Sequence, residues 1–304
     1  MADNPQSKGV TRFVVKHVGV VGLGHMGHAF AVNLVEDGYQ VLAYDRDPKR
    51  AAALTGAHPA AGFHDLAARD VVLTSLPDDD ALAAVALGGD GLARVLAPGA
   101  VHISTSTVSP DISRRVAEEH ARHRQDYVAA PVLGNPDFAR ERKLFVLAGG
   151  ARSAVEKVRP LLERLGQRLF VIGEDAALAN VMKLAANALT ATTLECMGEV
   201  LALLRKGGID RHLAYDVLTN SLFDSRVHKT YGGKIVAERY TPRPDSPYGW
   251  PPRTCASRSL PPRKARCQCP RRASSTITLS NWLPAGGPSW TGRLSACWRP
   301  WMLA

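Results

Sequence analysis

The chain has 304 residues, which suits one large or two ordinary domains. Its 45% apolar and 22% charged residues exclude a disordered or fibrous protein. The net charge of +10 points toward anionic partners, but residues 242–304 hold ten Lys or Arg and one acid, Asp245, and so supply nine of those charges. Because the same segment holds all five Trp and four of the five Cys, two different compositions are joined in one chain.

Residues Met1–Lys16 form a polar leader without the apolar run of a secretory signal. No apolar run reaches the roughly 18 residues that a membrane-spanning helix needs. Ala176–Leu204 comes nearest, but Lys183, Glu195 and Glu199 interrupt it. We therefore expect a cytoplasmic protein with reduced thiols and no membrane contact.

Short β-like runs alternate with helical patterns over the first part of the chain. Ser109 has the character of a helix cap, and Pro110 follows it at the first helical position. The alternation predicts an α/β fold with a doubly wound parallel sheet over residues 1–174. The predicted strands are His17–Val21, Val41–Tyr44, Val71–Ser75, Val101–Ser104, Tyr127–Ala129, Leu144–Ala148 and Leu169–Ile172, and the predicted helices are Met26–Asp37, Pro48–Leu54 and one that starts at Pro110.

Residues 175–241 change to purely helical spacing, without a strand signal. They are predicted to form a long interdomain helix and the start of an all-α domain. That domain is incomplete, because the periodicity stops after Pro242. The predicted helices are Ala176–Lys206, which Gly207 and Gly208 end, then Asp210–Leu218 and Lys229–Glu238.

Gly22-Leu23-Gly24-His25-Met26-Gly27 has the spacing G-x-G-x-x-G, between a predicted strand and a predicted helix. In this motif Gly22 permits a tight turn, Gly24 lets a pyrophosphate approach the backbone, and Gly27 lets helix and strand pack closely. Free N–H groups at the helix start favour phosphates. The motif therefore predicts a Rossmann-type dinucleotide-binding domain, in which His25 is exposed in the loop and is not a catalytic base.

Asp45 follows the second predicted strand, 18 residues after Gly27, near the distance where an acid binds the adenosine ribose. Its carboxylate would accept hydrogen bonds from the ribose and repel a 2′-phosphate, which favours NAD over NADP. Arg46 either pairs with a 2′-phosphate or is only a solvated charge at the strand end. Both cofactors therefore stay open, with NAD preferred.

Lys183 and Asn187 are spaced i, i+4 and share one face of the long predicted helix. Because the neighbours of Lys183 are apolar, burial should lower its pKa and let it exchange a proton near neutral pH. The alternative is a lysine that extends from a core helix toward water. No metal site is predicted, because Cys267 and Cys269 are too close together and have no matching pair.

Five segments, in the right order, resemble the β-hydroxyacid dehydrogenases, the family of 3-hydroxyisobutyrate dehydrogenase and of the N-terminal part of 6-phosphogluconate dehydrogenase. They lie within about residues 17–240 and are the glycine motif, Leu76-Pro77, Ser106-Thr107-Val108-Ser109-Pro110, Ala130-Pro131-Val132-Leu133-Gly134-Asn135, and Lys183 with Asn187. The resemblance implies hydride transfer between nicotinamide and a hydroxy acid or oxo acid. It also implies that the all-α domain, which starts within residues 175–241, serves substrate binding and dimerisation, and that an intact member of the family is a homo-oligomer.

The resemblance further implies roles for individual residues. Lys183 would be the catalytic acid or base. The substrate would lie against Ser106, Gly134, Asn135 and Asn187. The cofactor would contact Gly22, Leu23, Gly24, His25, Met26, Gly27, Asp45, Arg46, Leu76, Pro77 and Thr107. The alternative for Ser106 and Thr107 is that they are ordinary polar residues at a strand end or turn. The alternative for Gly134 is an ordinary turn.

Leu133 and Asn135 depart from the Ser-Gly-Gly that is usual in this family's carboxylate-binding loop. Leu133 cannot donate a hydrogen bond to a carboxylate, whereas the side-chain amide of Asn135 can. The departure points away from a small 3-hydroxy acid and toward a bulkier or less acidic substrate. An imine reductase shares the architecture and is the nearest enzymatic alternative, although a lysine suits oxygen chemistry better.

Residues 242–304 lack the helices with which this family continues. If each codon starts at the third base of the present one, Arg253–Ala256 can encode Asp-Val-Arg and Thr276–Trp282 can encode Asp-His-Phe-Ile-Glu-Leu, strings that resemble the missing helices. We therefore expect a shifted reading frame near Pro242, the alternative being a divergent tail. Because of this tail, two alternatives to an active enzyme stay open. The chain is an inactive dinucleotide-binding remnant, or it binds nucleic acid through the Arg-rich tail, which has no recognisable motif for specific binding.

Overall fold

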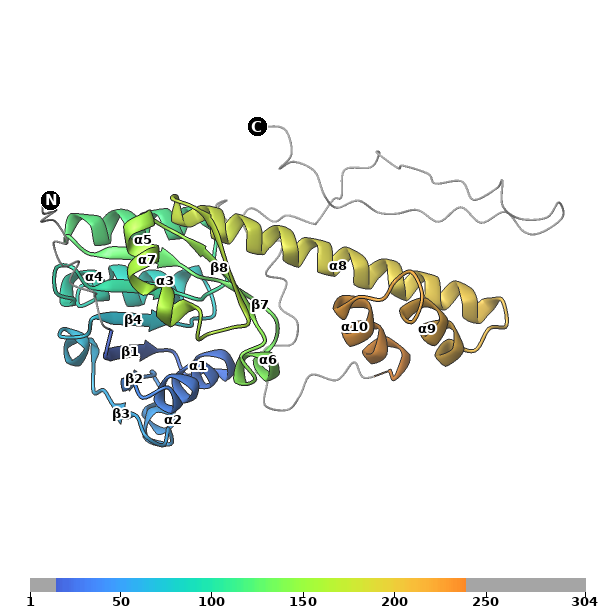
Figure 1. Cartoon of the computed structure of the whole chain (residues 1–304), viewed down its shortest axis with the longest axis horizontal. Coiled ribbons are helices and arrows are strands. Elements are labelled where there is room, and N and C mark those ends of the chain that lie inside the picture. Colours follow the sequence, from blue (N-terminus) through green and yellow to red (C-terminus); the bar gives the residue numbers. More distant parts are fainter. Residues whose placement is uncertain (1–14, 239–304) are drawn as a thin grey trace, which may run out of the picture. The chain divides into compact units, whose positions relative to one another are not determined.

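A computed structural model of the chain describes residues 15–238. The first 14 residues and the tail 242–304, with its expected change of reading frame, lie outside the described residues. Within them, strands and helices alternate up to β9, and only helices follow, as Figure 1 shows. The Rossmann-type fold class is thereby confirmed, whereas the domain boundaries at residues 174 and 241 stay predictions.

The strands of the described residues form one sheet in the order β3-β2-β1-β4-β5-β6-β8-β7, with β9 beside β8. Pairing is parallel from β3 to β6, as the alternation predicts. β8 is antiparallel to β6 and β7, because the chain turns back through one short helix instead of a long crossover. The strands are β1 His17–Val21, β2 Gln40–Tyr44, β3 His58–Pro59, β4 Val71–Thr74, β5 Val101–Ser104, β6 Asp126–Ala129, β7 Val132–Leu133, β8 Phe145–Gly149 and β9 Arg168–Gly173.

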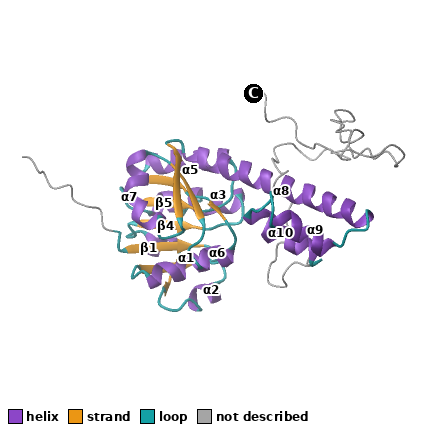
Figure 2. Cartoon of the chain, turned by 45° about the vertical axis from the view of Figure 1, so that its right-hand side comes forward, coloured by secondary structure: helices purple, strands orange, loops and turns teal. Residues whose placement is uncertain are grey.

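Helices cover both faces of the sheet (Figure 2). On one face, α1 and α7 bury Phe30 and Val158 against the strands. On the other, α3, α5 and the start of α8 bury Leu82, Val116 and Ala179. The helices are α1 His25–Glu36, α2 Pro48–Ala52, α3 Asp79–Leu87, α4 Leu92–Val95, α5 Pro110–Arg122, α6 Pro136–Arg140, α7 Arg152–Leu162, α8 Ala176–Lys206, α9 Arg211–Thr219 and α10 Arg226–Val236, with a 3₁₀ turn at Phe63–Leu66.

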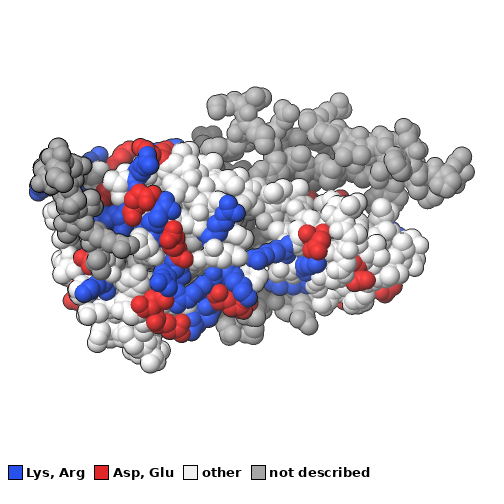
Figure 3. All heavy atoms as spheres, in the orientation of Figure 1, with Lys and Arg blue, Asp and Glu red and all other residues white. Residues whose placement is uncertain are grey.

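Charged side chains of both signs are interspersed on the face of the molecule seen in Figure 3. Two ion pairs join the segment around α6 to the end of α1: Arg140 of α6 pairs with Glu36 of α1, and Arg142 Nη1 lies 2.6 Å from Asp37 Oδ2. These ion pairs tie the segment after β7 to α1, so they hold two loops of the predicted site on a common support.

The helix α8 links the sheet to α9 and α10. Its first turns pack against the sheet, whereas Leu201 near its end packs with Ala214 of α9 and Val236 of α10. α10 begins three residues earlier than predicted, because the Ser225 hydroxyl caps it by accepting a hydrogen bond from the N–H of His228. Among residues 15–238, no helix is both long and apolar enough to cross a membrane.

Candidate active site

The loop between β1 and α1 has the geometry of a phosphate-binding site. Gly22 has φ +87°, and a Cβ atom there would lie 2.5 Å from the Ser75 carbonyl oxygen. A Cβ atom on Gly27 would lie 1.8 Å from the Gly22 carbonyl oxygen, so helix and strand approach as closely as the motif predicts. A Cβ atom on Gly24 would meet nothing within 4 Å. This open backbone, at a helix start with no side-chain cap and no acid, fits the pyrophosphate of a dinucleotide.

Asp45 holds this loop from the end of β2. Its Oδ2 accepts a hydrogen bond of 2.7 Å from the N–H of Leu23, and its Oδ1 accepts one of 2.9 Å from Asp47. Only 8% of the Asp45 side chain is exposed, and Arg50 Nη1 lies 3.9 Å from Oδ2. Because each carboxylate oxygen can accept more than one hydrogen bond, ribose hydroxyls fit beside these contacts. Arg46, next to it, is exposed.

Parallel pairing brings the loops after β1, β2, β4 and β5 to one edge of the sheet. Val21 pairs with both Tyr44 and Thr74, and Thr74 pairs with Ser104. The glycine loop, Asp45, the loop with Leu76 and Pro77 and the loop with Ser106 and Thr107 follow these residues. They therefore meet at the carboxyl edge, where the strand order reverses between β1 and β4, which is the usual place for a ligand in such a sheet.

Two hydrogen bonds join the loops after β4 and β5. The N–H of Leu76 donates to Ser106 Oγ at 2.8 Å, and the N–H of Ser109 donates to Asp79 Oδ1 at 2.8 Å. Ser106 is buried, whereas Thr107 is half-buried. Since Ser106 accepts the bond from Leu76, its own hydroxyl proton is left for another acceptor.

The loop after β7 contains Gly134 and Asn135. Gly134 has φ +138°, and a Cβ atom there would lie 2.4 Å from Leu144 Cδ2, so this position requires glycine. Asn135 caps α6, because its Oδ1 accepts a hydrogen bond of 3.0 Å from the N–H of Phe138. The cap uses one lone pair of the Asn135 side-chain oxygen and fixes the orientation of the amide, whose two N–H groups can donate to a substrate.

Lys183 lies on α8, two turns after the helix begins, and Asn187 follows one turn later on the same face. Burial lowers the pKa of Lys183 from 10.5 to about 8. No charged side chain of the described residues contributes to this shift. No hydrogen bond among them joins Lys183 to the cofactor loops, so the structure places it on its helix face without a partner. An amine with this pKa can accept or return a proton near neutral pH.

One buried polar residue of α8 is not predicted from the sequence as part of the site. Asn180 is 1% exposed, and its Oδ1 has no hydrogen-bond partner within the described part of the chain. The signal in the sequence that could have identified Asn180 is that it is the one amide among alanines, Ala176, Ala177 and Ala179, in the first turns of the helix.

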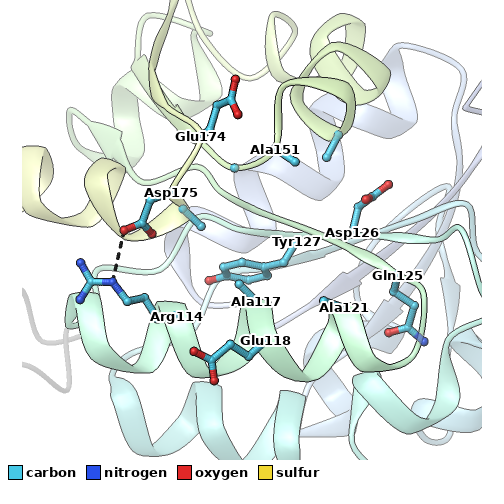
Figure 4. Close-up of a pocket in the computed structure, with 13 residues that line it drawn as sticks. Arg114, Ala117, Glu118, Ala121, Gln125, Asp126, Tyr127, Ala151, Glu174 and Asp175 are labelled. Carbon is cyan, nitrogen blue, oxygen red and sulfur yellow. Dashed lines mark hydrogen bonds and ion pairs between the residues drawn. The ribbon is translucent and has the colours of Figure 1, made fainter.

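A groove of about 420 Å³ lies between α5, the start of α7 and the start of α8 (Figure 4). Arg114 Nε donates to Asp175 Oδ2 at 3.2 Å on its wall, and Tyr127 and Glu118 also line it. None of the predicted site residues lines this groove, so it is separate from the candidate active site.

Two family patterns match the chain. The NAD binding domain of 6-phosphogluconate dehydrogenase matches residues 17–173, and the NAD-binding pattern of NADP-dependent 3-hydroxyisobutyrate dehydrogenase matches residues 177–244. The oxidoreductase YfjR of Bacillus subtilis is 36% identical over 228 residues, which are 74% of this chain and 79% of that protein.

Relatives with named activities are also similar. The NAD-dependent L-serine dehydrogenase of Pseudomonas aeruginosa is 31% identical, covering 76% of this chain and 75% of its own length. The crystal structure of 3-hydroxyisobutyrate dehydrogenase from Salmonella typhimurium superposes with a TM-score of 0.67 at 26% identity, over 75% of this chain and 80% of that one. An imine reductase from Streptomyces aurantiacus has a TM-score of 0.60 at 26% identity, over 74% and 80%.

The sheet topology, the glycine cradle and these matches define an NAD(P)-dependent oxidoreductase. More narrowly, the chain belongs to the β-hydroxyacid dehydrogenase family, of which 3-hydroxyisobutyrate dehydrogenase is a member. The resemblance identified from the sequence motifs is confirmed.

Proposed function

We propose that this chain oxidises a hydroxy acid to its oxo acid in the cytoplasm and reduces NAD, with Lys183 as the acid or base. The observation that supports this most is the amine of Lys183, whose pKa burial lowers to about 8, on the helix that directly follows a dinucleotide-binding sheet. Relatives named for L-serine and 3-hydroxyisobutyrate make such a hydroxy acid the natural substrate class.

Gly22, Gly24 and Gly27 would hold the cofactor's pyrophosphate at the start of α1, and Asp45 would bind its ribose. When bound, NAD(P) supplies the nicotinamide that accepts or donates the hydride. Lys183 Nζ, in its neutral form, would take the proton of the substrate hydroxyl as the carbonyl forms. In the reverse direction the ammonium would return that proton to the oxygen.

Ser106, Gly134, Asn135 and Asn187 are the residues we propose for substrate binding. The capping bond of Asn135 leaves its N–H groups as donors, which suits an anionic or carbonyl group on the substrate. Leu133 offers only an apolar contact. An imine substrate is the second candidate, since an imine reductase shares the fold, but the amine of Lys183 favours proton exchange with oxygen.

The test is turnover of the purified chain with NAD or NADP and a panel that contains L-serine, 3-hydroxyisobutyrate and L-threonate. Lys183→Ala is expected to lower kcat by about 10²–10⁴-fold while NAD binding changes little, because the lysine acts on the substrate proton. Lys206→Ala, at the far end of the same helix, is the matched control. Unchanged kcat in Lys183→Ala would remove the lysine from the chemistry.

We also infer that residues 242–304 are translated from a shifted reading frame. The abrupt change in composition supports this, as does the family match that stops at residue 244. Exposed apolar residues of the helical segment support it too: Leu189 of α8 is 71% exposed, and Leu222, between α9 and α10, is 93% exposed. The chain as it stands would then bind the cofactor but turn over poorly, so cofactor binding without turnover would indicate a remnant. We propose a homo-oligomer only for the protein whose reading frame after Pro242 is restored.

A further inference from the structure

The side chain of Asn180 is the buried polar group of α8 that the proposed chemistry leaves unused. It is 1% exposed, and its Oδ1 has no hydrogen-bond partner among the described residues. A buried oxygen without a hydrogen bond destabilises the fold, and asparagine is also a poorer helix former than alanine. The neighbouring buried positions of this helix, Ala176, Ala177 and Ala179, are all alanine. Stability alone would therefore favour an apolar residue at position 180.

Asn180 precedes Lys183 by one helical turn, so both residues lie on the same face of α8. Side chains on a helix lean toward its N-terminus, so the stem of Lys183 runs back over the turn that carries Asn180. Asn187 follows Lys183 by one further turn, so the sequence order along this face is asparagine, lysine, asparagine.

The two buried groups complement each other chemically. Lys183 is a donor that no described side chain accepts from, and burial is the cause of its lowered pKa. The Oδ1 of Asn180 is an acceptor that no described group donates to. In a helix, an i, i+3 pair has its Cβ atoms about 5–6 Å apart, a separation that the long, flexible side chain of a lysine can span.

We propose that Asn180 is a positioning residue for Lys183: its Oδ1 accepts a hydrogen bond from Nζ and holds the amine in place on the α8 face. This rests on the proposed role of Lys183 in proton transfer. The bond leaves the remaining N–H groups, or the lone pair of the neutral amine, directed away from the helix. It also favours the charged form, because an acceptor stabilises an ammonium more than an amine.

The pKa of Lys183 tests this directly and needs no turnover. The full chain is labelled with acetic anhydride over a pH series, and the modified Lys183 peptide is quantified by mass spectrometry. In Asn180→Leu, the midpoint of labelling is expected to fall by about one pH unit, which is the tenfold change that one charge-assisted hydrogen bond is worth. In Asn180→Asp, the midpoint is expected to rise, because a carboxylate replaces the amide at the same distance.

Asn220→Leu, in which the exposed asparagine at the C-terminal cap of α9 is changed in the same way, is the matched control and should leave the midpoint unchanged. Other lysines in the same digest give the internal reference, and thermal melting checks that each variant folds. Equal midpoints in all variants would overturn the proposal. A shift in Asn180→Asp alone would overturn it as well, because the native amide would then not be bonded. Since labelling is independent of turnover, loss of the proposed enzyme activity would leave this result standing.

Discussion

Asp45 has a structural role that the hydrogen bonds show and a selective role that we propose. Its two oxygens accept hydrogen bonds from the backbones of Leu23 and Asp47, so the glycine loop and the proposed ribose site would depend on the same carboxylate. Asp45→Asn keeps the shape and removes the charge, so the repulsion of a 2′-phosphate disappears. We expect NAD to bind about tenfold more weakly and NADP to bind equally well or better. Fluorescence titration measures both, with Asp47→Asn as control, and equal weakening of both cofactors would contradict the ribose role.

Gly24 and Gly27 are three residues apart and predict opposite consequences for the same substitution. A Cβ atom on Gly24 meets nothing, whereas on Gly27 it overlaps the Gly22 carbonyl oxygen at 1.8 Å. Gly24→Ala should therefore melt like the parent chain but lose most of its cofactor affinity, because the methyl occupies the path of the pyrophosphate. Gly27→Ala should melt clearly lower. Calorimetry and cofactor titration on both variants distinguish the outcomes, and a fold defect in Gly24→Ala would contradict the open cradle.

A buried row of polar side chains links four elements of the sheet domain. Thr74 Oγ1 lies 3.0 Å from His102 Nε2, His102 Nδ1 lies 2.8 Å from His120 Nε2, and His120 Nδ1 lies 2.6 Å from Gln125 Oε1. Gln125 Nε2 donates to two carbonyls near the end of α4. The amide oxygen must therefore accept from His120, which in turn must accept from His102, so the network assigns both histidines the neutral Nδ1–H form.

This row predicts how stability depends on pH. Burial lowers the pKa of His102 well below its ordinary 6.5 and that of His120 to about 4. Below about pH 6.5, these histidines bind protons in the unfolded chain but not in the folded chain. Their contribution to the free energy of unfolding is therefore fully present above that pH and is lost as the pH decreases toward 4. Each histidine contributes a slope of about 1.4 kcal/mol per pH unit.

Urea unfolding between about pH 5 and 8 measures this slope. A variant with both His102→Leu and His120→Leu is expected to be less stable overall, because Gln125 and Thr74 lose partners, but to lose most of the slope. His64→Gln, an exposed histidine, should retain it. A double variant with the parental slope would assign the pH dependence to other groups.

The elements that the sequence predicts best are those whose burial is complete. β4 is predicted because a strand covered on both faces is a nearly continuous apolar run, and β1 and β5 contain enough apolar residues to be predicted in the same way. α3 and α7 are not predicted: α3 is almost uniformly apolar after its acidic first turn, and α7 has no capping side chain and contains Pro160. In the site, the glycine motif is predictable because its spacing is itself what phosphate binding requires. Asn180 is not predictable, because its proposed role depends on its burial, and residue spacing does not reveal burial.

At the scale of the whole molecule, the helical segment presents more apolar surface than its own packing covers. Leu189, Leu213, Val217 and Leu222 are each more than half exposed. Contiguous apolar surface of this kind marks an interface or a missing part of a core. If residues 242–304 are read out of frame, as we propose, amphipathic helices encoded after codon 242 would have their apolar faces available to cover these side chains.

Restoring the frame tests this inference in full. A gene in which each codon after Pro242 starts at the third base of the present one should encode an uninterrupted amphipathic segment. The restored protein is expected to melt about 10 °C higher, because several leucines gain about 1.5–3 kcal/mol each from burial, and to bind less of a hydrophobic dye. Turnover should rise with it, since the added helices would close the substrate side of Lys183. A stop codon in that frame, or a restored protein that melts lower and binds more dye, would instead make residues 242–304 a genuine divergent tail.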